Sequence, residues 1–566
     1  MSNVYRINTQ TGNISDEKLK EEYRFWGNRG LVAKVMNDEV NPKCEPLGPE
    51  NKLIVCTGIL AGTGVSTANR VSVGGKSPLT GTIKEANVGG NVGTFLAQHD
   101  IKMLIFENEP TDSKWHLFKI DKNGHVELIP ADNYIGLNNY ALVEKLYGVY
   151  GKDIGVLSIG VAGERKYRNS TLQATDFSTG HPARAAARGG LGAVLGAKHI
   201  KAVIIEKPAQ KHEVIYADKE RFTNANKKFT ETLIKASKES KEIGTIRIVD
   251  ETAPKARMPV RNFSGELFDT ERIKKINSKG YLKKQKENNG KTGLPCQAGC
   301  VVQCSNVYNN SKGDFVTSGL EYETVVLCGP NCDIDNLDYI AEVDKLCDDI
   351  GIDTIETGAT IAVCMEAGRI HWGDEKAALG LIKEMRDGTK FGQLLGQGTE
   401  VVGKKLRVKR IPTVKGQSMA AYEPRNMKGM GVTYATNAMG ADHTTGPVMV
   451  PGMDLSHKAG QIALSTTFQN MMAMVDNFIC LFALAGTMRD TTILPDMMAG
   501  VFGGEWNISK INEIGIQTRN MERQFNTAAG FTIQDNCLPD FFYTEPSPAT
   551  GSKFDLSIEE MAQVFK

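Results

Sequence analysis

Four short apolar runs in the first 207 positions predict β-strands. They are LIVCTGI (53–59), KMLIFE (102–107), IGVLSIG (154–160) and KAVIIE (201–206). Each has the length of a strand and is bounded by Gly, Asn or Pro, which punctuate strands. Glycine is frequent between the runs. The pattern therefore predicts a β-rich N-terminal domain over residues 1–207.

The pattern after residue 207 is mainly that of helices. In the lysine-rich stretch 217–242, apolar residues recur at roughly helical spacing, so we expect its lysines to form a solvated face. These apolar residues are Phe222, Phe229, Leu233 and Ile234. Residues 264–294 are polar and basic and predict a helix and a loop.

A second strong helix is predicted within DIDNLDYIAEVDKLCDDIGID (333–353). Asp335 or Asn336 can cap its start, and Gly351 can end it. Beyond about residue 415 the chain is again mainly helical, with glycine-rich turns. We therefore expect an α+β multidomain protein, with mainly helical domains over 208–415 and 416–566 following the β-rich domain.

Composition narrows the class of protein. The 566 residues include 67 Lys plus Arg and 66 Asp plus Glu, a net charge of +1, which gives no sign of the basic face that nucleic acid or a membrane surface would need. The N-terminus lacks the order of a secretory signal. The most apolar segment (471–486) carries Asp476 and Asn477 in its middle, which indicates a buried segment rather than a membrane span. We expect a cytoplasmic protein.

Three of the eleven cysteines stand close together. Cys296, Cys300 and Cys304 form C-x₃-C-x₃-C in a chain where reduced cysteines are expected. Such a density of thiolates suits an iron–sulfur cluster or zinc, although three small buried hydrophobic residues are the alternative. An electron-transfer cluster needs a fourth ligand, and spacing does not choose among the candidates. These are Cys328, Cys332, Cys347, Cys364, Cys480 and Cys537.

Two glycine-rich, basic segments, 66–93 and 180–206, are candidates for binding phosphate or pterin. The alternative is tight turns between strands. Within the second, G-L-G-A-V-L-G (190–196) imitates a dinucleotide fingerprint, but the obvious strand follows it instead of preceding it, which disfavours a Rossmann site. No Walker A motif is present.

Ordered motifs along the chain resemble the aldehyde ferredoxin oxidoreductase family, enzymes whose tungsten is held by two pterins. The motifs are GPENKL (48–53), KSPLTGTI (76–83), SIGVAGE (158–164), RAAARGGLGAV (184–194), LEYETV (320–325), CDDIGIDTI (347–355), AYEPR (421–425), YATNAMGADH (434–443), CLF (480–482) and LPDFFYTEPSP (538–548). Their common order over nearly the full length is more specific than any one motif.

The resemblance implies cofactor roles for matching residues. Cys480 becomes the fourth ligand of a [4Fe-4S] cluster, and Cys537 a spectator. Arg70 lies between cluster and pterin, while Asn87 and Ala185 support a magnesium ion that bridges the pterin phosphates. The other implied cofactor-binding residues are Lys76, Gly89, Gly90, Arg184, Arg188, Gly189, Asp348, Gly351, Ile352, Asp353 and Asp476. Among these, Ile352 replaces the leucine of the family's D-x-x-G-L-D motif.

Glu323 in EYET and His443 in GADH match the two polar side chains beside the family's metal. A carboxylate can take a proton from the attacking water, and an imidazole can polarise a carbonyl oxygen. Taken alone, either would be read as an ordinary buried hydrogen-bonding group. The resemblance assigns them to catalysis.

Three departures from the family pattern affect these expectations. The cysteine motif gains a residue between Cys296 and Cys300, and D-N-F-I-C before the fourth cysteine is one residue shorter than the usual D-x-x-G-L-C. Where some relatives carry E-x-x-H ligands for an interfacial iron, this chain has Glu342 and Lys345, and protonated lysine is a poor ligand. We predict no iron there, although a homodimer can form by other contacts.

The resemblance thus implies an oxidoreductase with tungsten or molybdenum on two pterins, a [4Fe-4S] cluster and magnesium. Its expected substrates are aldehydes, oxidised to carboxylates, with electrons passing to ferredoxin or another small iron–sulfur protein. The alternatives are a reductase of the same family that acts on an activated aromatic acid, a non-catalytic electron-transfer protein, and a zinc-structured binding protein.

Overall fold

Two six-stranded sheets form the N-terminal part of the protein. The computed structural model describes residues 2–450 and 452–566. The first sheet has the order β2-β1-β6-β3-β4-β5, and only its β1–β6 pair is parallel. Its strands are β1 (Asn3–Asn8), β2 (Ile14–Lys18), β3 (Leu53–Thr57), β4 (Val71–Lys76), β5 (Ile83–Val88) and β6 (Ile101–Glu107).

The second sheet has the order β11-β10-β9-β12-β7-β8. Its strands are β7 (His116–Ile120), β8 (Val126–Pro130), β9 (Ile154–Ser158), β10 (Leu172–Ala174), β11 (Arg184–Ala186) and β12 (Ile200–Glu206). One apolar core joins the two sheets, with Phe106 of β6 and Phe118 of β7 packed edge to face at 5.4 Å. The edge strands β5 and β11 also lie in contact, so the two sheets meet along one line.

Five helices accompany the sheets: α1 (Asn28–Glu39), α2 (Val92–Gln98), α3 (Asn139–Tyr150), α4 (Val161–Glu164) and α5 (Leu191–Ala197). The four strands predicted from apolar runs are confirmed as β3, β6, β9 and β12. The segment 190–196 does follow a short strand and open a helix, contrary to our expectation. However, β11 and β12 run in opposite directions, so no parallel βαβ unit forms.

The middle of the chain is mainly helical. Its helices are α6 (Lys219–Ala236), α7 (Lys238–Ile243), α8 (Ile248–Thr252), α9 (Thr270–Ile276), α10 (Ser278–Glu287), α11 (Tyr322–Leu327), α12 (Leu337–Ile350), α13 (Thr354–Glu366), α14 (Glu375–Asp387), α15 (Lys390–Leu395) and α16 (Thr399–Leu406). A small sheet of β13 (Lys291–Leu294), β14 (Ser305–Asn309) and β15 (Phe315–Ser318) interrupts them, and β16 (Thr413–Val414) pairs with β17 (Gln417–Ser418).

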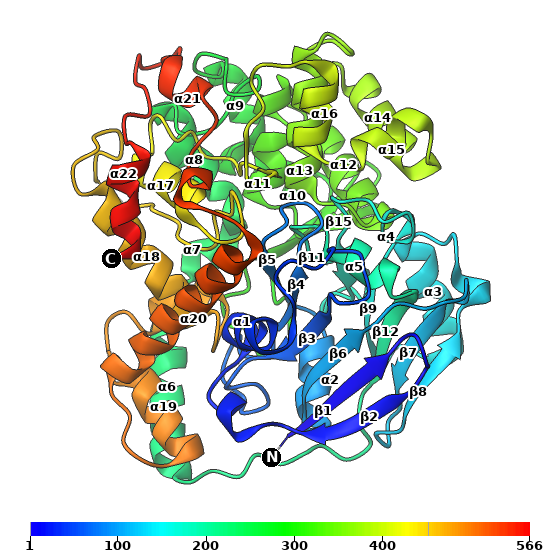
Figure 1. The fold of residues 1–566 in the computed structure, drawn as a ribbon. Helices are drawn as coiled ribbons and strands as arrows, with labels where there is room; N and C mark the ends of the chain where they lie inside the picture. Colours follow the sequence, from blue (N-terminus) through cyan, green and yellow to red (C-terminus); the bar gives the residue numbers. More distant parts are fainter. Residues whose placement is uncertain (1, 451) are drawn as a thin grey trace.

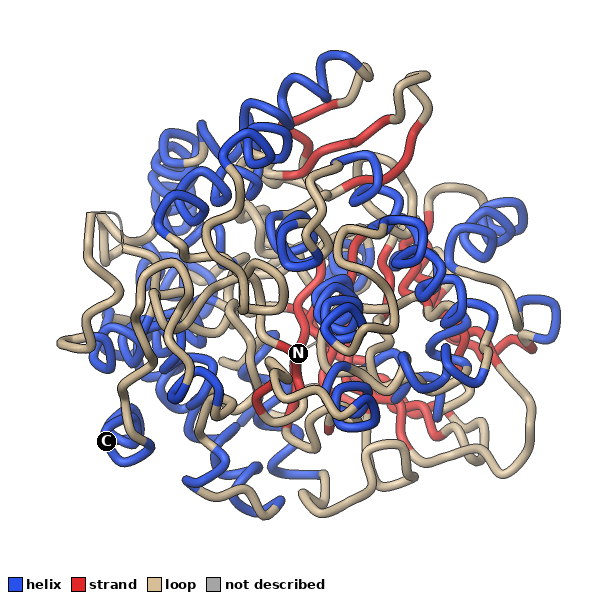
Figure 2. The backbone as a smooth tube through the Cα atoms, turned by 90° about the horizontal axis from the view of Figure 1, so that it is seen from above, coloured by secondary structure: helices blue, strands red, loops and turns tan. Residues whose placement is uncertain are grey.

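The last part contains α17 (Lys428–Thr436), α18 (Gln461–Val475), α19 (Ile493–Phe502), α20 (Ile508–Ala529), α21 (Phe541–Thr544) and α22 (Ile558–Met561). The sheets occupy one side of the molecule and α9–α16 lie above them, while α6 and α18–α20 form the opposite flank (Figure 1). Most strands run through the interior, with helices around them (Figure 2). The expected fold class, a β-rich domain followed by mainly helical domains, is confirmed.

Local details refine the predicted helices. The lysine-rich stretch is helical but breaks at Ser237, and Ile234 is 50 % exposed, so its assignment to the apolar face is wrong. Asn336 caps α12, whereas Asp335 pairs with Lys275 at 2.8 Å. The region before the cysteines ends in strand β13, which the polar sequence did not predict.

The apolar segment 471–486 is split between the end of α18 and a 3₁₀ turn (Leu481–Gly486). None of the helices in the described residues is long and apolar enough to cross a membrane.

Candidate functional site

The three clustered cysteines lie in the irregular loop between β13 and β14, not on a helix. Gly299 and Gln303, each directly before a cysteine, have positive φ values of 74° and 51°, which turn the loop sharply. The Gly90 N–H donates to the Cys296 carbonyl at 2.8 Å, tying the loop to the N-terminal sheet. All eleven cysteines are free.

The guanidinium of Arg70 is the common neighbour of four thiols. The charges of Cys296, Cys300, Cys304 and Cys480 all act on it, and its Nη1 lies 3.7 Å from Cys296 Sγ. A hydrogen bond with Cys300 and the nearby Arg70 lower the pKa of the Cys296 thiol to about 6, against the opposing effect of burial. The structure thus brings together the four cysteines that the resemblance selected.

These thiols are not placed to coordinate a single metal ion. Within residues 2–450 and 452–566, no three His, Cys, Asp or Glu side chains are placed to hold a single ion. A four-iron cluster takes one thiolate at each iron, so its ligands enclose a larger space than a zinc site does. Gln297, fully buried in the same loop, has no hydrogen-bond partner for either amide atom among the described residues. This orphaned amide fits a site completed by a bound group.

Cys480 reaches the loop from another part of the chain. It directly follows the turn after α18, and its N–H donates to Thr67 Oγ1 at 3.3 Å. Cys537 lies elsewhere, where the charge of Lys415 acts on it. This placement supports the preference for Cys480.

Asn87 and Ala185 lie on the two edge strands that meet, β5 and β11. Arg70 contacts Asn87 twice, through Nε to Oδ1 and through Nη2 to the carbonyl oxygen at 3.0 Å. At Gly89, a Cβ atom would lie only 3.1 Å from Cys296 Sγ and 3.3 Å from Arg70 Nη1, so a larger residue would crowd the cysteine. The two sheets therefore meet beside the cysteine loop.

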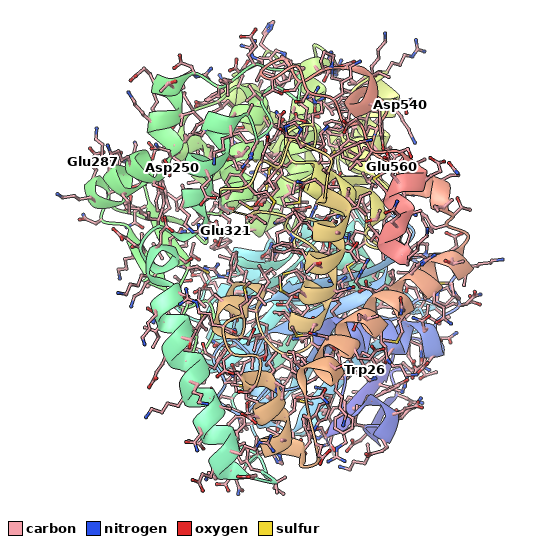
Figure 3. All side chains as sticks on the ribbon, turned by 90° about the vertical axis from the view of Figure 1, so that its left-hand side faces the viewer. Trp26, Asp250, Glu287, Glu321, Asp540 and Glu560 are labelled. Atoms are coloured by element: carbon pink, nitrogen blue, oxygen red, sulfur yellow. The ribbon has the colours of Figure 1, made fainter. Side chains whose placement is uncertain are left out.

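Two buried acidic residues, Asp344 and Asp348, lie near Arg184. Arg184 pairs with Asp176 and contacts the Ser305 hydroxyl. Burial and the charge of Asp344 raise the pKa of Asp348, and burial raises that of Asp344 to about 7. Burial likewise raises the pKa of Glu321 to about 7. Glu321 lies where the helical part meets the sheets (Figure 3).

The D-D-I-G-I-D segment forms the junction between α12 and α13. Gly351 adopts φ 81° and ends α12, and Asp353 caps α13 by accepting from the Ile355 N–H at 2.9 Å. Arg188 Nε lies 3.3 Å from Asp353 Oδ2, and its Nη1 donates to the Ala441 carbonyl at 2.6 Å. Arg188 thus links this junction to the loop that carries His443.

Asp476 belongs to a second charged group. Arg29 Nη1 lies 3.2 Å from Asp476 Oδ2, and the same guanidinium pairs with both oxygens of Glu522 at 2.7 and 2.9 Å. Burial raises the pKa of Asp476 to about 6, which Arg29 opposes. Arg29 and Glu522 were not predicted from the sequence, because each lies on a helix, where a charge is usually solvated.

Glu323 and His443 are brought together. Glu323 stands in the first turn of α11 and His443 in the loop after α17, with Nε2 3.0 Å from Oε1. Neither Glu323 Oε1 nor His443 Nδ1 has a well-directed hydrogen bond among the described residues, although both are buried. The Tyr422 ring lies 5.9 Å from the imidazole, and the buried Tyr434 hydroxyl likewise has no hydrogen-bond partner in the described part of the chain.

Two charged residues beside this pair were not predicted from the sequence. Lys84 and Asp442 form a buried ion pair next to His443. Burial alone would raise the pKa of Asp442, but Lys84 and Arg188 hold it well below its usual range. A lysine inside a buried strand was a usable signal, because such a charge needs a partner. The side chain of Lys84 also lies where a Cβ on Gly189 would stand.

The ammonium of Lys76, a predicted cofactor residue, is held by the backbone. It donates to the carbonyl oxygens of Pro42 at 2.6 Å and Cys44 at 2.7 Å, and its role toward a cofactor stays a prediction. Lys345, at the place of the family's interfacial iron ligand, lies 3.6 Å from the Tyr140 ring centroid. The predictions of no iron at that position and of dimerisation stay predictions.

Comparison with known proteins accounts for this arrangement. Family models described as the N-terminal domain and domains 2 and 3 of aldehyde ferredoxin oxidoreductase match residues 4–207 and 221–565. The tungsten-containing aldehyde ferredoxin oxidoreductase of Pyrococcus furiosus is 31 % identical over 97 % of this chain and 92 % of its own length. The corresponding enzyme of Thermococcus kodakarensis is 30 % identical over the same shares.

Two further proteins are more distant. The chain is 26 % identical to the aliphatic sulfonate oxidoreductase, WOR-like subunit, of Pyrococcus furiosus, over 95 % of the chain and 87 % of that protein. Its fold resembles the active-site complex of benzoyl coenzyme A reductase with 1,5-dienoyl-CoA, with a TM-score of 0.81, 17 % identity, and coverage of 100 % of this chain and 93 % of that one. The chain belongs to the aldehyde ferredoxin oxidoreductase family and is an oxidoreductase.

Proposed function

We propose that this enzyme oxidises aldehydes to carboxylates with tungsten, or molybdenum, on two pterins, and passes the electrons through a [4Fe-4S] cluster to ferredoxin or another small iron–sulfur protein. The observation that carries the proposal is the Glu323–His443 pair, 3.0 Å apart, in which Glu323 Oε1 and His443 Nδ1 have no well-directed hydrogen bond among the described residues. The names of the relatives support tungsten.

The proposed cofactor ligands follow from the site. Four cysteines next to Arg70 would hold the cluster: Cys296, Cys300, Cys304 and Cys480. The pterins would lie against the Arg184–Asp348 group and the Arg188–Asp353 group on one side, and near Asp476 on the other. Asn87 and Ala185, on the touching strands β5 and β11, would support magnesium.

The reaction needs one water, and it releases two electrons and three protons when an aldehyde becomes a carboxylate. When bound, the pterin metal supplies the two-electron acceptor, and the cluster supplies one-electron transfer. Glu323 would accept a proton from the water through Oε1. His443 would hydrogen-bond the carbonyl oxygen and polarise it, while Asp442, held by Lys84, fixes the loop that carries the imidazole.

Electrons would leave to the protein partner near Cys480. Phe482, two residues after Cys480, is 40 % exposed and lies in the 3₁₀ turn that begins there. A partner that contacts this turn would lie near a proposed cluster ligand.

Replacement of Glu323 by Gln tests the proposal. Anaerobically purified protein should contain tungsten or molybdenum and reduce viologen with aldehydes, and Glu323→Gln should lower turnover by about 10²–10⁴-fold with metal content unchanged. Glu342→Gln, on the exposed face of α12, is the matched control and should keep full turnover. Unchanged turnover in Glu323→Gln would remove its catalytic role, and iron without tungsten or molybdenum would refute the cofactor assignment.

Reduction of an activated aromatic acid is the second candidate. It is supported by the fold shared with benzoyl coenzyme A reductase over the whole chain. A fully metallated enzyme that turns over no aldehyde but oxidises reduced viologen with an aromatic coenzyme A thioester would favour this reaction over the first.

A further inference from the structure

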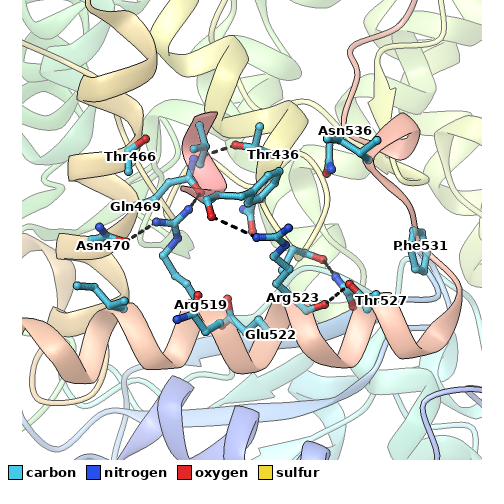
Figure 4. A pocket seen from close by; sticks show the side chains of 18 of the residues that line it. Thr436, Thr466, Gln469, Asn470, Arg519, Glu522, Arg523, Thr527, Phe531 and Asn536 are labelled. Carbon is cyan, nitrogen blue, oxygen red and sulfur yellow. Dashed lines mark hydrogen bonds between the residues drawn. The ribbon is translucent and has the colours of Figure 1, made fainter. Parts of the chain in front are cut away.

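A separate cavity lies between α18, α20 and the C-terminal residues. Its volume is about 490 Å³, within the range of small-molecule sites. Arg519 and Arg523, one helical turn apart on α20, both point into it (Figure 4). Lys415 lines the same cavity from another segment. Neither Glu323 nor any of the four proposed cluster cysteines is among the lining residues.

Among the described residues, Arg519, Arg523 and Lys415 contact only neutral acceptors. Arg519 donates to the amide oxygens of Gln469, at 3.2 Å, and Asn470. Arg523 Nη1 lies 3.4 Å from the Phe565 carbonyl, and its guanidinium stacks over the Phe565 ring at 4.3 Å. Among the described residues, neither arginine forms an ion pair with a carboxylate.

Lys415 shows the same arrangement. Its Nζ donates to the Ala435 carbonyl at 2.7 Å and to Asn536 Oδ1 at 2.9 Å. The one acidic residue in the lining, Glu522, has both oxygens occupied by Arg29 at 2.7 and 2.9 Å. Its charge still acts on Arg519, but among the described residues no carboxylate lies within ion-pair distance of the other cations.

The positive charge in this cavity is costly. Arg519 and Lys415 are partly buried and Arg523 is exposed. Charges withdrawn from water are normally paired, and like charges one helical turn apart repel each other. Burial and the charge of Arg29 lower the pKa of Arg519 to about 10, and burial lowers that of Lys415 to about 8. Both directions agree with cations held without an adjacent carboxylate, a cost that an anion in the cavity would reduce.

We propose that this cavity binds a small organic anion with two or more acidic groups, a phosphate ester or a polycarboxylate. Arg519 and Arg523 would bind one acidic group through their guanidinium forks, and Lys415, across the cavity, the other. The lining also includes Ile516, Phe531 and Ile533, which give an organic ligand an apolar contact. Nothing in this proposal depends on the reaction at Glu323.

Titration calorimetry on the metal-loaded enzyme tests the site, with inorganic pyrophosphate and citrate as probes at physiological ionic strength. We expect saturable binding with one site per chain by at least one probe. Tighter pyrophosphate binding would assign the natural ligand to the phosphate esters, and tighter citrate binding to the polycarboxylates. Lack of saturable binding by both probes would overturn the proposal.

Three variants locate the binding. Arg519→Gln and Arg523→Gln should each weaken it about tenfold or more, because each removes a charge-assisted contact. Lys510→Gln, which removes an exposed cation from the same helix outside the cavity, should change affinity less than twofold. Equal affinity in Arg523→Gln and Lys510→Gln would mean that the anion binds elsewhere and would refute the site. Because Arg523 is exposed, its replacement should not disturb folding, so this test stands even if Arg519→Gln folds poorly.

Discussion

The cysteine loop and the α12–α13 junction both serve the proposed cofactors, but they are built in different ways. The junction combines local and distant support: Gly351 ends α12 and Asp353 caps α13, and the Thr171 N–H donates to the Gly351 carbonyl at 2.9 Å. The cysteine loop has no helix caps of this kind. It depends on distant segments: the Gly90 N–H donates to the Cys296 carbonyl, and the Val301 N–H donates to the Ser66 hydroxyl oxygen at 3.1 Å.

The difference has an energetic meaning. The helix caps and the backbone hydrogen bonds keep the junction in place whether or not a ligand is bound. The loop contains positive-φ residues and the buried, unpartnered Gln297, so its conformation costs free energy that a bound cluster would offset. The loop should therefore depend on metal, and the junction should not.

Loss of a cluster ligand should have the largest effect. We expect Cys480→Ser to lose most of the roughly four iron atoms per chain, because a serine oxygen is a much poorer ligand for this cluster than a thiolate. Cys537→Ser is the control and should retain them. Iron analysis and visible absorbance measure the result, and iron loss in the Cys537 variant instead would show that the fourth ligand is misassigned.

Loss of the Lys84–Asp442 ion pair beside His443 should have the second largest effect. Lys84 is 0 % exposed, so Lys84→Met leaves Asp442 with Arg188 as its remaining cationic partner and should destabilise the protein by about 3–5 kcal/mol. A lower thermal midpoint would report it. Lys404→Met breaks an exposed pair with Glu400 and should cost at most about 1 kcal/mol. Equal midpoints for the two variants would contradict the structural role of Lys84.

The junction was predictable from the sequence because its determinants are local. Asn336, Gly351 and the apolar spacing between them specify a capped helix, and the structure has it. The β-strands were predictable for the same reason. Ile234 was misassigned because the helical period predicts a face but not what covers it.

The cysteine loop and the charge pairs were not predictable in this way. Spacing did not choose the fourth cysteine, since Cys480 reaches the loop through tertiary contacts; only the resemblance selected it. The Arg29–Glu522 pair joins residues 493 positions apart, and no local pattern links them. Gln297 looked like an ordinary loop residue until its burial was known.

Stability on the helical side should depend on pH through Asp344. Burial raises the pKa of this carboxyl to about 7, above its unfolded value of 3.8, so the folded protein keeps a proton that the unfolded chain loses. Stability should fall as pH rises from about 4 to 7 and then level off. We expect Asp344→Asn to gain about 1–3 kcal/mol at pH 8 and little at pH 4. Thermal midpoints at both pH values, with exposed Asp314→Asn as control, measure this; an equal gain at both would refute the linkage.

The smallest expected effect is that of replacing Gln297 in the cysteine loop. If cluster sulfurs are the missing partners of Gln297, its amide N–H stabilises the more negative, reduced cluster. Gln297→Leu should then lower the reduction potential by tens of millivolts, roughly the equivalent of one hydrogen bond, without loss of iron. Redox titration followed by electron paramagnetic resonance measures the shift, and Gln393→Leu, exposed on α15, should show none. An unchanged potential would mean that the buried amide serves the fold of the loop rather than the cluster, and the contrast with the α12–α13 junction would then rest on backbone geometry alone.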